Sequence, residues 1–444
     1  MWKDYLKKLK TKLFHPKRIL LITNRGSDNC GDQILEASDI ALVRTVMKNL
    51  HISPLRYSII SRDAGLVPKR YVEKRDPKDL EDARRTISSC DLVLFGGAPM
   101  FNHLYQIFYE RTCLTIELAA EYGKPVVFSA IGIEAYDENS PKCQRIRQAA
   151  NLPCVKRITT RDDYDALCSI RTREDLMIDK VPDPAVFCDR IFRKFSRRQS
   201  AGRGRKRIGV FVLRERGFED NRMPFAHEKV VELYRDLYAE LEERGYECRY
   251  MTSGHFADEA TLQKLITECG IPKKKCVPNM LSPEQMFSEI SACDGVISCR
   301  LHPSIVAYSC QIPSVGLQWN NKVPGFYDSM GYSDRVVGCA DLTAKHVADV
   351  LEDAIRGGVV KDTEYMYRLY TNLFEGIRDS LCPDKAGARP YTMEELTQHL
   401  APYRGTKDAE MKLKLERKFK RIYDKYNDLQ RKLGEKPDGK DQTD

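Results

Sequence analysis

Short apolar runs recur along the whole chain and are separated by stretches in which apolar residues have helical spacing. Seven of these runs are bounded by Gly or polar residues: Ile19–Ile22, Asp91–Phe95, Pro125–Phe128, Arg157–Thr160, Arg207–Val212, Glu247–Met251 and Gly295–Ser298. Continuous runs of this length predict strands buried on both faces, as in parallel sheets covered by helices. The pattern therefore predicts an α/β fold, in which ligands bind beyond the carboxyl ends of the strands.

The repeated pattern is interrupted near the middle of the chain. Residues 190–206 are rich in Ser, Gly and Arg, a composition typical of an interdomain linker. We therefore predict a first α/β domain over residues 19–189 and a second over residues 207–355, with a cleft between them. A helical C-terminal region follows over residues 356–444, and a basic amphipathic helix precedes the first domain over residues 1–18.

The C-terminal tail has the pattern of one long amphipathic helix. From about Lys407 to Leu433, apolar side chains recur among dense mixed charge: Met411, Leu413, Leu415, Phe419, Ile422, Tyr423, Tyr426 and Leu429. Such a helix can pair with another helix or with another subunit. A homo-oligomer is therefore one arrangement that the tail suggests.

Charge is distributed unevenly over the 444 residues, whose formal net charge is +9. Residues 1–18 carry +6, residues 190–207 carry +9 and residues 403–444 carry +4, which leaves −10 for the rest of the chain. An acidic body with basic attachments does not favour a generally basic nucleic-acid surface. The basic linker also lacks interleaved stacking aromatics beyond Phe192 and Phe195, so we expect no nucleic-acid partner.

The composition and the cysteines limit the class of protein further. The chain is 42% apolar and 31% charged, which excludes collagen-like and disordered proteins, and no apolar run is long enough to span a bilayer. Its 15 cysteines include no CxxC pair, so a zinc ribbon and a redox dithiol are unsupported, and we expect no metal site. Free thiols in this number favour the cytoplasm.

The first 14 residues place Trp2, Leu6 and Leu9 on the face opposite five lysines. This is the pattern of a helix lying in the interface of an anionic membrane, where each basic residue contributes about 1 kcal/mol. The predicted location is then the inner face of the cell membrane, with peripheral attachment. The alternative is a capping helix packed on the first sheet.

Two glycine-containing loops follow predicted strands of the first domain. In the first loop, Asn29 and Gly31 precede a helix, and free backbone N–H groups there suit an anion or a sugar hydroxyl. Asp32 is a candidate general base toward a hydroxyl, or else the N-cap of that helix. In the second loop, Gly96 and Gly97 permit close approach of a ligand to the backbone, or else form a tight turn.

The second domain carries the most specific candidates. Arg300 and His302 lie two residues apart after a predicted strand, from whose end both can project into the same cleft. Arg offers a permanently charged fork for carboxylate or phosphate, and His titrates near neutrality. Arg214, after the first strand of this domain, is a candidate second anion ligand, although alone it would pass as an ordinary surface residue.

In combination, these residues resemble the polysaccharide pyruvyl transferase family. The resemblance extends from Ile19 to Ala340 and rests on motifs in a fixed order: Asn29-x-Gly31-Asp32, Asp91–Gly97, Thr160-Arg161-Asp162, Asp183–Phe187, Val212-Leu213-Arg214, Asp294–His302, Gln311–Gly316 and Lys322. The resemblance implies two Rossmann-like domains in a glycosyltransferase-B-like arrangement. It also implies transfer of a pyruvyl group from phosphoenolpyruvate to a sugar of a surface polysaccharide, or of its lipid-linked precursor, as a ketal.

The chemistry of this donor is consistent with the candidate residues. Phosphoenolpyruvate has a carboxylate and a phosphate, for which Arg214 and Arg300 are suitable ligands. His302 is the candidate acid that protonates the vinyl carbon, and Asp32 is the candidate base for the acceptor hydroxyl. Lys322 is a further candidate phosphate contact, or else a solvated loop residue. No step requires a metal or another cofactor.

Two other functions remain open on the sequence alone. A nucleotide-sugar-dependent glycosyltransferase would share the same two-domain architecture. A non-catalytic relative that binds glycans or a protein partner would keep the fold and function without His302.

Overall fold

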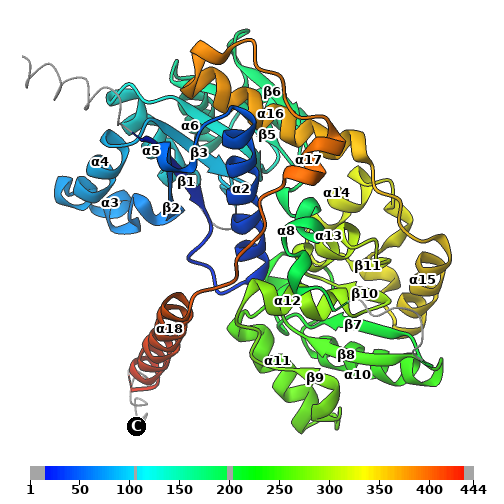
Figure 1. Cartoon of the computed structure of the whole chain (residues 1–444). Coiled ribbons are helices and arrows are strands. Elements are labelled where there is room, and N and C mark those ends of the chain that lie inside the picture. The colour runs from blue at the N-terminus through cyan, green and yellow to red at the C-terminus, as the bar shows by residue number, and fades with distance from the viewer. Residues whose placement is uncertain (1–15, 105–107, 198–203, 435–444) are drawn as a thin grey trace, which may run out of the picture. The chain divides into compact units, whose positions relative to one another are not determined.

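The computed structural model describes residues 16–104, 108–197 and 204–434. The chain divides into two units, of which the first ends at Tyr403 and the second begins at Arg404. The first unit contains two parallel sheets with helices on both faces, and the second contains one long helix (Figure 1). The predicted basic helix at the N-terminus lies outside the described residues.

The first sheet has six parallel strands in the order β2-β1-β3-β4-β5-β6. Its strands are β1 (Lys17–Thr23), β2 (Tyr57–Asp63), β3 (Leu92–Gly96), β4 (Val126–Ile131), β5 (Val155–Thr160) and β6 (Met177–Lys180). Its helices are α2 (Cys30–Asn49), α3 (Lys69–Lys74), α4 (Glu81–Ser88), α5 (Tyr109–Glu121), α6 (Pro141–Ala150), α7 (Tyr164–Ile170) and α8 (Cys188–Ile191). The strand order reverses between β1 and β3, and open α/β sheets bind ligands at such a switch point.

The second sheet also has six parallel strands, in the order β12-β11-β10-β7-β8-β9. Its strands are β7 (Arg207–Phe211), β8 (Glu247–Met251), β9 (Cys276–Val277), β10 (Gly295–Ser298), β11 (Ser314–Leu317) and β12 (Val336–Val337). Its helices are α9 (Gly217–Asp220), α10 (Glu228–Glu243), α11 (Phe256–Thr267), α12 (Pro283–Ser291), α13 (Leu301–Ser309), α14 (Lys322–Ser329) and α15 (Ala344–Gly357). This is the strand order of the Rossmann fold, with its switch point between β7 and β10.

All seven predicted strands are present, with ends within three residues of those expected. The prediction missed β2, β6, β9, β11 and β12. All five lie at or next to a sheet edge, β9 and β12 are only two residues long, and β2 has no fully buried residue. An edge strand such as β2, which buries so little, carries no continuous apolar run in its sequence.

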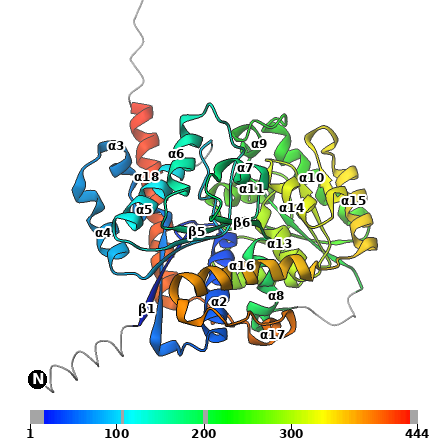
Figure 2. The same cartoon turned by 90° about the horizontal axis from the view of Figure 1, so that it is seen from above.

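The chain returns to the first sheet after completing the second. Helix α16 (Thr363–Leu381) packs on β4, β5 and α2 (Figure 2), and α17 (Met393–His399) follows it. Gly376 permits this approach, because a Cβ there would lie 3.0 Å from the side chain of Val127 on β4. The contact also has a polar part, in which Arg157 of β5 donates to Asn372 at 2.6 Å.

One cluster of buried apolar side chains is shared by both sheets of the first unit. It includes Leu21 and Leu94 of the first sheet, Val296 of the second, and Ile34 of α2 and Ile305 of α13 between them. Burial of apolar surface is the main favourable contribution to folding. The facing loops of the two domains are therefore held against each other by a common core.

The second unit contains α18 (Asp408–Gly434), which confirms the long helix predicted for the tail. Within the described part of the chain, no helix combines the length and apolar character needed to cross a membrane.

Candidate active site

Asn29, and not Asp32, caps the helix that follows the first strand. The Asn29 side chain accepts a hydrogen bond from the Gly31 N–H at 2.9 Å, immediately before α2 begins at Cys30. Asp32 lies in the first turn, where its Oδ2 accepts from the Asn24 Nδ2 at 2.9 Å. The capping role considered for Asp32 is therefore wrong, and its Oδ1 is directed elsewhere.

The Asp32 Oδ1 lies 4.0 Å from the Nδ1 of His302, which belongs to the other domain. The imidazole lies against the N-terminus of α2, because a Cβ on Gly31 would come within 2.4 to 2.6 Å of His302 atoms. Gly31 is thus required here for the close approach of His302. The structure thus brings the candidates Gly31 and Asp32 together with the candidate His302, which follows them by about 270 residues in the sequence.

His302 is almost fully buried, and its Nε2 has no hydrogen-bond partner among the described residues. Burial lowers its pKa to about 4, although the nearby Asp32 carboxylate acts in the opposite direction. The free imidazole is therefore neutral at neutral pH. An unsatisfied buried ring nitrogen costs free energy unless a ligand supplies its partner.

The sequence interpretation expected Arg300 and His302 to project together from the end of a strand. The structure shows otherwise. Strand β10 ends at Ser298, Arg300 is the N-cap residue of α13, and His302 lies in its first turn. The two side chains therefore diverge, with His302 near Asp32 and Arg300 directed into the second domain.

Arg300 forms a buried ion pair that the sequence analysis missed. Its Nε and Nη2 donate to the two carboxylate oxygens of Asp258 on α11, at 2.9 and 2.7 Å. Asp258 is completely buried and also accepts from the backbone N–H of Arg214 at 3.0 Å. One carboxylate thus positions both predicted anion ligands of this domain.

Arg214 is paired with a different and more exposed carboxylate. Its Nε and Nη2 both donate to the Asp220 Oδ2, at 3.0 and 2.8 Å. The Trp319 ring lies close to both arginines, with its centre 5.9 Å from the Arg214 Cζ and 4.8 Å from the Arg300 Cζ. The Trp319 Nε1 is buried and has no hydrogen-bond partner in the described part of the chain, so the site contains a donor that the sequence interpretation did not include.

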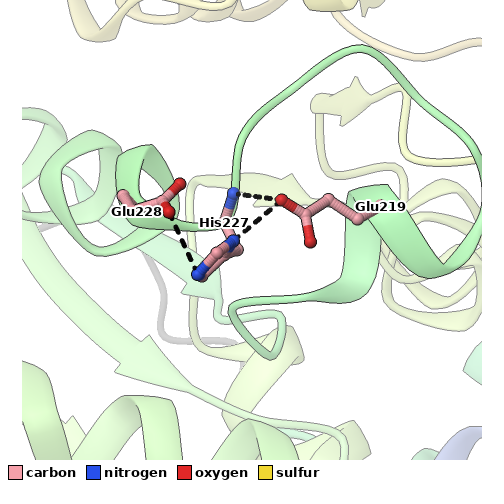
Figure 3. A group of neighbouring side chains, drawn as sticks. All are labelled: Glu219, His227 and Glu228. Carbon is pink, nitrogen blue, oxygen red and sulfur yellow. Dashed lines mark hydrogen bonds and ion pairs between the residues drawn. The ribbon is translucent and has the colours of Figure 1, made fainter.

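The short helix that carries Asp220 is held by a His–carboxylate group (Figure 3). The Nδ1 of His227 lies 2.8 Å from Glu219 and its Nε2 lies 3.2 Å from Glu228. Among the described residues this is the one group of three side chains close enough to hold a metal ion. The two carboxylates contact opposite ring nitrogens, however, so the arrangement is that of a group of polar contacts that positions α9 beside Arg214.

Lys322 begins α14 and faces charged groups of the first domain. Burial lowers the pKa of its ammonium, while Asp162, Glu134 and Asp32 oppose this shift. Arg161, at the end of β5, acts electrostatically on both Lys322 and His302, and it forms a buried ion pair with Asp183. Lys322 is therefore not a solvated loop residue, and Arg161 joins the candidate site.

Gly96 and Gly97 are explained by helix packing. A Cβ on Gly96 would lie 2.3 Å from the Asp39 carboxylate, and one on Gly97 would lie 2.7 Å from the Leu35 side chain, both on α2. Burial, followed by the charge of Asp183, raises the pKa of Asp39 well above its usual range. Ligand contact at these two glycines stays a prediction.

The first and second domains also touch through their backbones beside these residues. The Cys30 N–H donates to the Ser253 carbonyl at 2.7 Å. Gly254 adopts a φ of +91°, and a Cβ there would lie 2.9 Å from the Asp28 carbonyl. The loop after β8 thus fits directly against the loop after β1, which ends at Asn29 and leads into the first turn of α2 with Asp32.

Comparison with known proteins shows which family has these candidate residues. The family model for polysaccharide pyruvyl transferase matches residues 15–321. The chain belongs to the polysaccharide pyruvyl transferase family. The match includes the β1 loop with Asp32, the arginines Arg214 and Arg300, and His302, and it ends one residue before Lys322. No match was found among curated protein sequences.

Solved structures support the fold of this transferase. A protein of Listeria monocytogenes assigned as a UDP-N-acetylglucosamine 2-epimerase is similar over 82% of this chain and 97% of its own, with 9% identity and a TM-score of 0.53. Another UDP-N-acetylglucosamine 2-epimerase covers 81% of this chain and 96% of its own, with 12% identity and a TM-score of 0.50. The predicted fold of two Rossmann-like domains in a glycosyltransferase-B-like arrangement is confirmed.

Proposed function

We propose that the protein transfers the pyruvyl group of phosphoenolpyruvate to two hydroxyls of a sugar, forming a ketal and releasing phosphate. The acceptor is a unit of a surface polysaccharide or its lipid-linked precursor. The observation that carries this proposal is the meeting of His302 and Asp32 from different domains, with an unsatisfied Nε2 on the imidazole. Family membership supports the same reaction class.

The donor carries two anionic groups, and the second domain offers matching cations. Arg300 uses Nε and Nη2 to bind Asp258, which leaves its Nη1 edge for the donor carboxylate or phosphate. Arg214 can exchange the exposed Asp220 for the donor, since an exposed ion pair contributes little. We assign Lys322 as a further phosphate contact, and the Trp319 Nε1 as a neutral donor to the same ligand.

The proposed reaction begins with protonation of the vinyl CH₂ carbon, which becomes a methyl group while positive charge develops on the adjacent carbon. One sugar hydroxyl then adds to that carbon and loses its proton. Phosphate leaves with its bonding electron pair, and the second hydroxyl adds and loses its proton. Of the two protons released, one replaces the proton consumed by the vinyl group, and the other leaves with the phosphate or passes to solvent.

His302 is the proposed acid, and Asp32 orients it and accepts hydroxyl protons. In the ligand-free protein the imidazole is neutral, because burial lowers its pKa to about 4. The negative charges of phosphoenolpyruvate would raise this pKa, so the acid would become protonated when the donor binds. Arg161 and Lys322 stabilise the charge that develops on the departing phosphate.

Donor identity can be tested by ligand-induced thermal stabilisation and by release of inorganic phosphate. Phosphoenolpyruvate should raise the Tm of the wild type, and the shift should be lost in Arg300→Ala. Arg235→Ala is the control, because among the described residues that exposed arginine pairs only with its neighbour Asp236. No shift with phosphoenolpyruvate, or stabilisation by UDP-N-acetylglucosamine instead, would point to a nucleotide-sugar enzyme.

Catalysis can be separated from binding with His302→Gln. This variant should retain binding of phosphoenolpyruvate but release no phosphate in the presence of acceptor glycans. Full cellular function in His302→Gln would instead support a non-catalytic binding protein.

Peripheral membrane attachment through residues 1–14 is a separate proposal. Deletion of those residues should reduce flotation with anionic vesicles and leave unchanged the release of phosphate from phosphoenolpyruvate in the presence of a soluble acceptor.

A further inference from the structure

Helix α18 exposes an unusual number of large apolar side chains. Phe419 is 71% exposed, Leu429 is 61% exposed and Leu433 is 67% exposed. Acidic residues begin the helix and basic residues end it, in agreement with the helix dipole. The helix is thus well specified by its sequence, but its apolar side chains have no covering partner in the described part of its own unit.

These side chains follow the spacing of a coiled coil. The seam consists of Leu415, Phe419, Ile422, Tyr426, Leu429 and Leu433, which are separated by alternating steps of four and three residues. This period of 3.5 residues defines positions a (Phe419, Tyr426 and Leu433) and d (Leu415, Ile422 and Leu429). With Lys412 at the preceding a position, the repeat covers three heptads.

The polar residues of α18 argue against a membrane surface as the partner. A membrane-bound helix has a broad apolar face and a polar face rich in Lys and Arg. Here the apolar stripe is confined mainly to the a and d positions, and Glu416, Asp424 and Asp428 interrupt the basic residues. The narrow seam fits another helix of the same kind better.

We propose that α18 pairs with α18 of a second copy of the chain in a parallel two-stranded coiled coil. The flanking residues select this orientation. Position g is Lys in three places (Lys418, Lys425 and Lys432), and position e is Glu416, Tyr423 and Gln430. In a parallel pair, Lys418 faces Tyr423 of the second copy and Lys425 faces Gln430, with no contact between like charges.

An antiparallel pair would place the g positions of both copies side by side, so that lysines would face lysines. A single Lys at an a position, here Lys412, favours a defined register and a small number of helices. In proteins, most of the stability of a helix comes from packing of its apolar face and not from intrinsic helix propensity. Pairing would supply the packing that the isolated helix lacks. The dimer goes beyond the proposed transferase reaction and does not depend on it.

The oligomeric state of the full chain tests the proposal. Light scattering after size exclusion should give twice the mass of one chain for the wild type, and the mass of one chain for Phe419→Glu or Leu429→Glu. The matched control is Leu413→Glu, because Leu413 is exposed on the same helix but lies outside the seam. A monomeric wild type, or equal dissociation by the control, would overturn the proposal.

Cross-linking tests the parallel orientation. In a parallel pair in register, two copies of Leu429→Cys bring their thiols together, and mild oxidation with copper phenanthroline should join them by a disulfide. Leu413→Cys and the wild type, which has an exposed Cys168, are the controls. Failure of Leu429→Cys to cross-link beyond both controls would exclude the parallel register.

Vesicle binding separates the dimer from the membrane alternative. Phosphatidylglycerol–phosphatidylcholine vesicles should capture the wild type and Phe419→Glu equally, because a seam that pairs with another helix contributes nothing to vesicle binding. If Phe419→Glu lost vesicle binding while its oligomeric state matched that of the wild type, the helix would be a membrane surface and the proposal would be wrong.

Discussion

The imidazole of His302 lies against the backbone of Gly31, so closely that a methyl group on this glycine would come within 2.4 Å of the His302 Cβ. The two residues belong to different domains. Their contact places the His302 Nδ1 4.0 Å from the carboxylate of Asp32, one residue after Gly31. The glycine in the first turn of α2 therefore determines where the histidine of the second domain can lie.

Gly31→Ala should inactivate the protein without unfolding it. The added methyl group displaces the imidazole, and a displacement of about 1 Å in an active site costs about 100-fold in rate. Phosphate release from phosphoenolpyruvate with an acceptor measures the loss. Gly325→Ala is the control, because a Cβ at that helical glycine meets no atom within 4 Å. Near-normal activity in Gly31→Ala would show that the contact with His302 is not needed.

The buried imidazole should make stability depend on pH. His302 has a folded pKa of about 4 and an ordinary value of 6.5. Between these values the unfolded chain binds a proton that the folded chain excludes. Stability is therefore lost as pH falls from about 6.5 to about 4, by up to about 3 kcal/mol for this group.

The measurement is Tm against pH for the wild type and for His302→Gln. The variant should show a smaller decrease of Tm between pH 6.5 and pH 4. His346→Gln, at an exposed histidine of α15, is the control and should leave the wild-type slope unchanged. Identical slopes for the wild type and His302→Gln would mean that His302 is not held neutral by burial.

Removal of the exposed carboxylate that pairs with Arg214 should strengthen donor binding. In Asp220→Asn, the guanidinium of Arg214 no longer has to exchange a carboxylate for phosphoenolpyruvate. Exposed ion pairs contribute about 1 kcal/mol or less, so the expected gain is at most about fivefold in Kd. Isothermal titration measures it, with Asp236→Asn as the control. Weaker binding in Asp220→Asn would indicate that Asp220 itself contacts the ligand.

Asp258→Asn should weaken donor binding, in contrast to Asp220→Asn, and should also destabilise the fold. Asp258 is fully buried and accepts both hydrogen bonds of Arg300, so its loss leaves a buried guanidinium without its charge partner. Breaking a buried pair in this way costs about 3–5 kcal/mol. A lowered Tm together with weaker binding of phosphoenolpyruvate is expected. An unchanged Tm would show that water or another residue readily replaces Asp258.

The sequence predicted the architecture well because buried parallel strands leave continuous apolar runs. It missed β2, which lies at the edge of the first sheet and has no fully buried residue. It also left open whether Asp32 is a base or the cap of α2. Asn29 and Asp32 are both good capping residues, and only the observed start of the helix at Cys30 decides between them.

The candidate site was predicted less completely than the fold. Asp258 had no recognisable signal, since its partners Arg214 and Arg300 lie 44 and 42 residues away in sequence and meet it only in the folded domain. Trp319 had a weak signal, as the one Trp outside the first 14 residues and shortly after a strand. The presence of Arg214 and Arg300 in the sequence also does not show that Asp220 and Asp258 are their carboxylate partners.

Two substitutions around His302 should shift its pKa in opposite directions. The carboxylate of Asp32 raises this pKa, and the ammonium of Lys322 lowers it. Asp32→Asn should therefore move the pKa below about 4, and Lys322→Gln should move it upward. Histidine ¹³C NMR over a pH series measures the shifts, and the His302 signal is assigned by its absence in His302→Gln. Lys345→Gln, at an exposed lysine, is the control for the loss of one positive charge. Shifts of the same sign in Asp32→Asn and Lys322→Gln would mean that a change in burial, and not the charge of either neighbour, sets the protonation of the proposed acid.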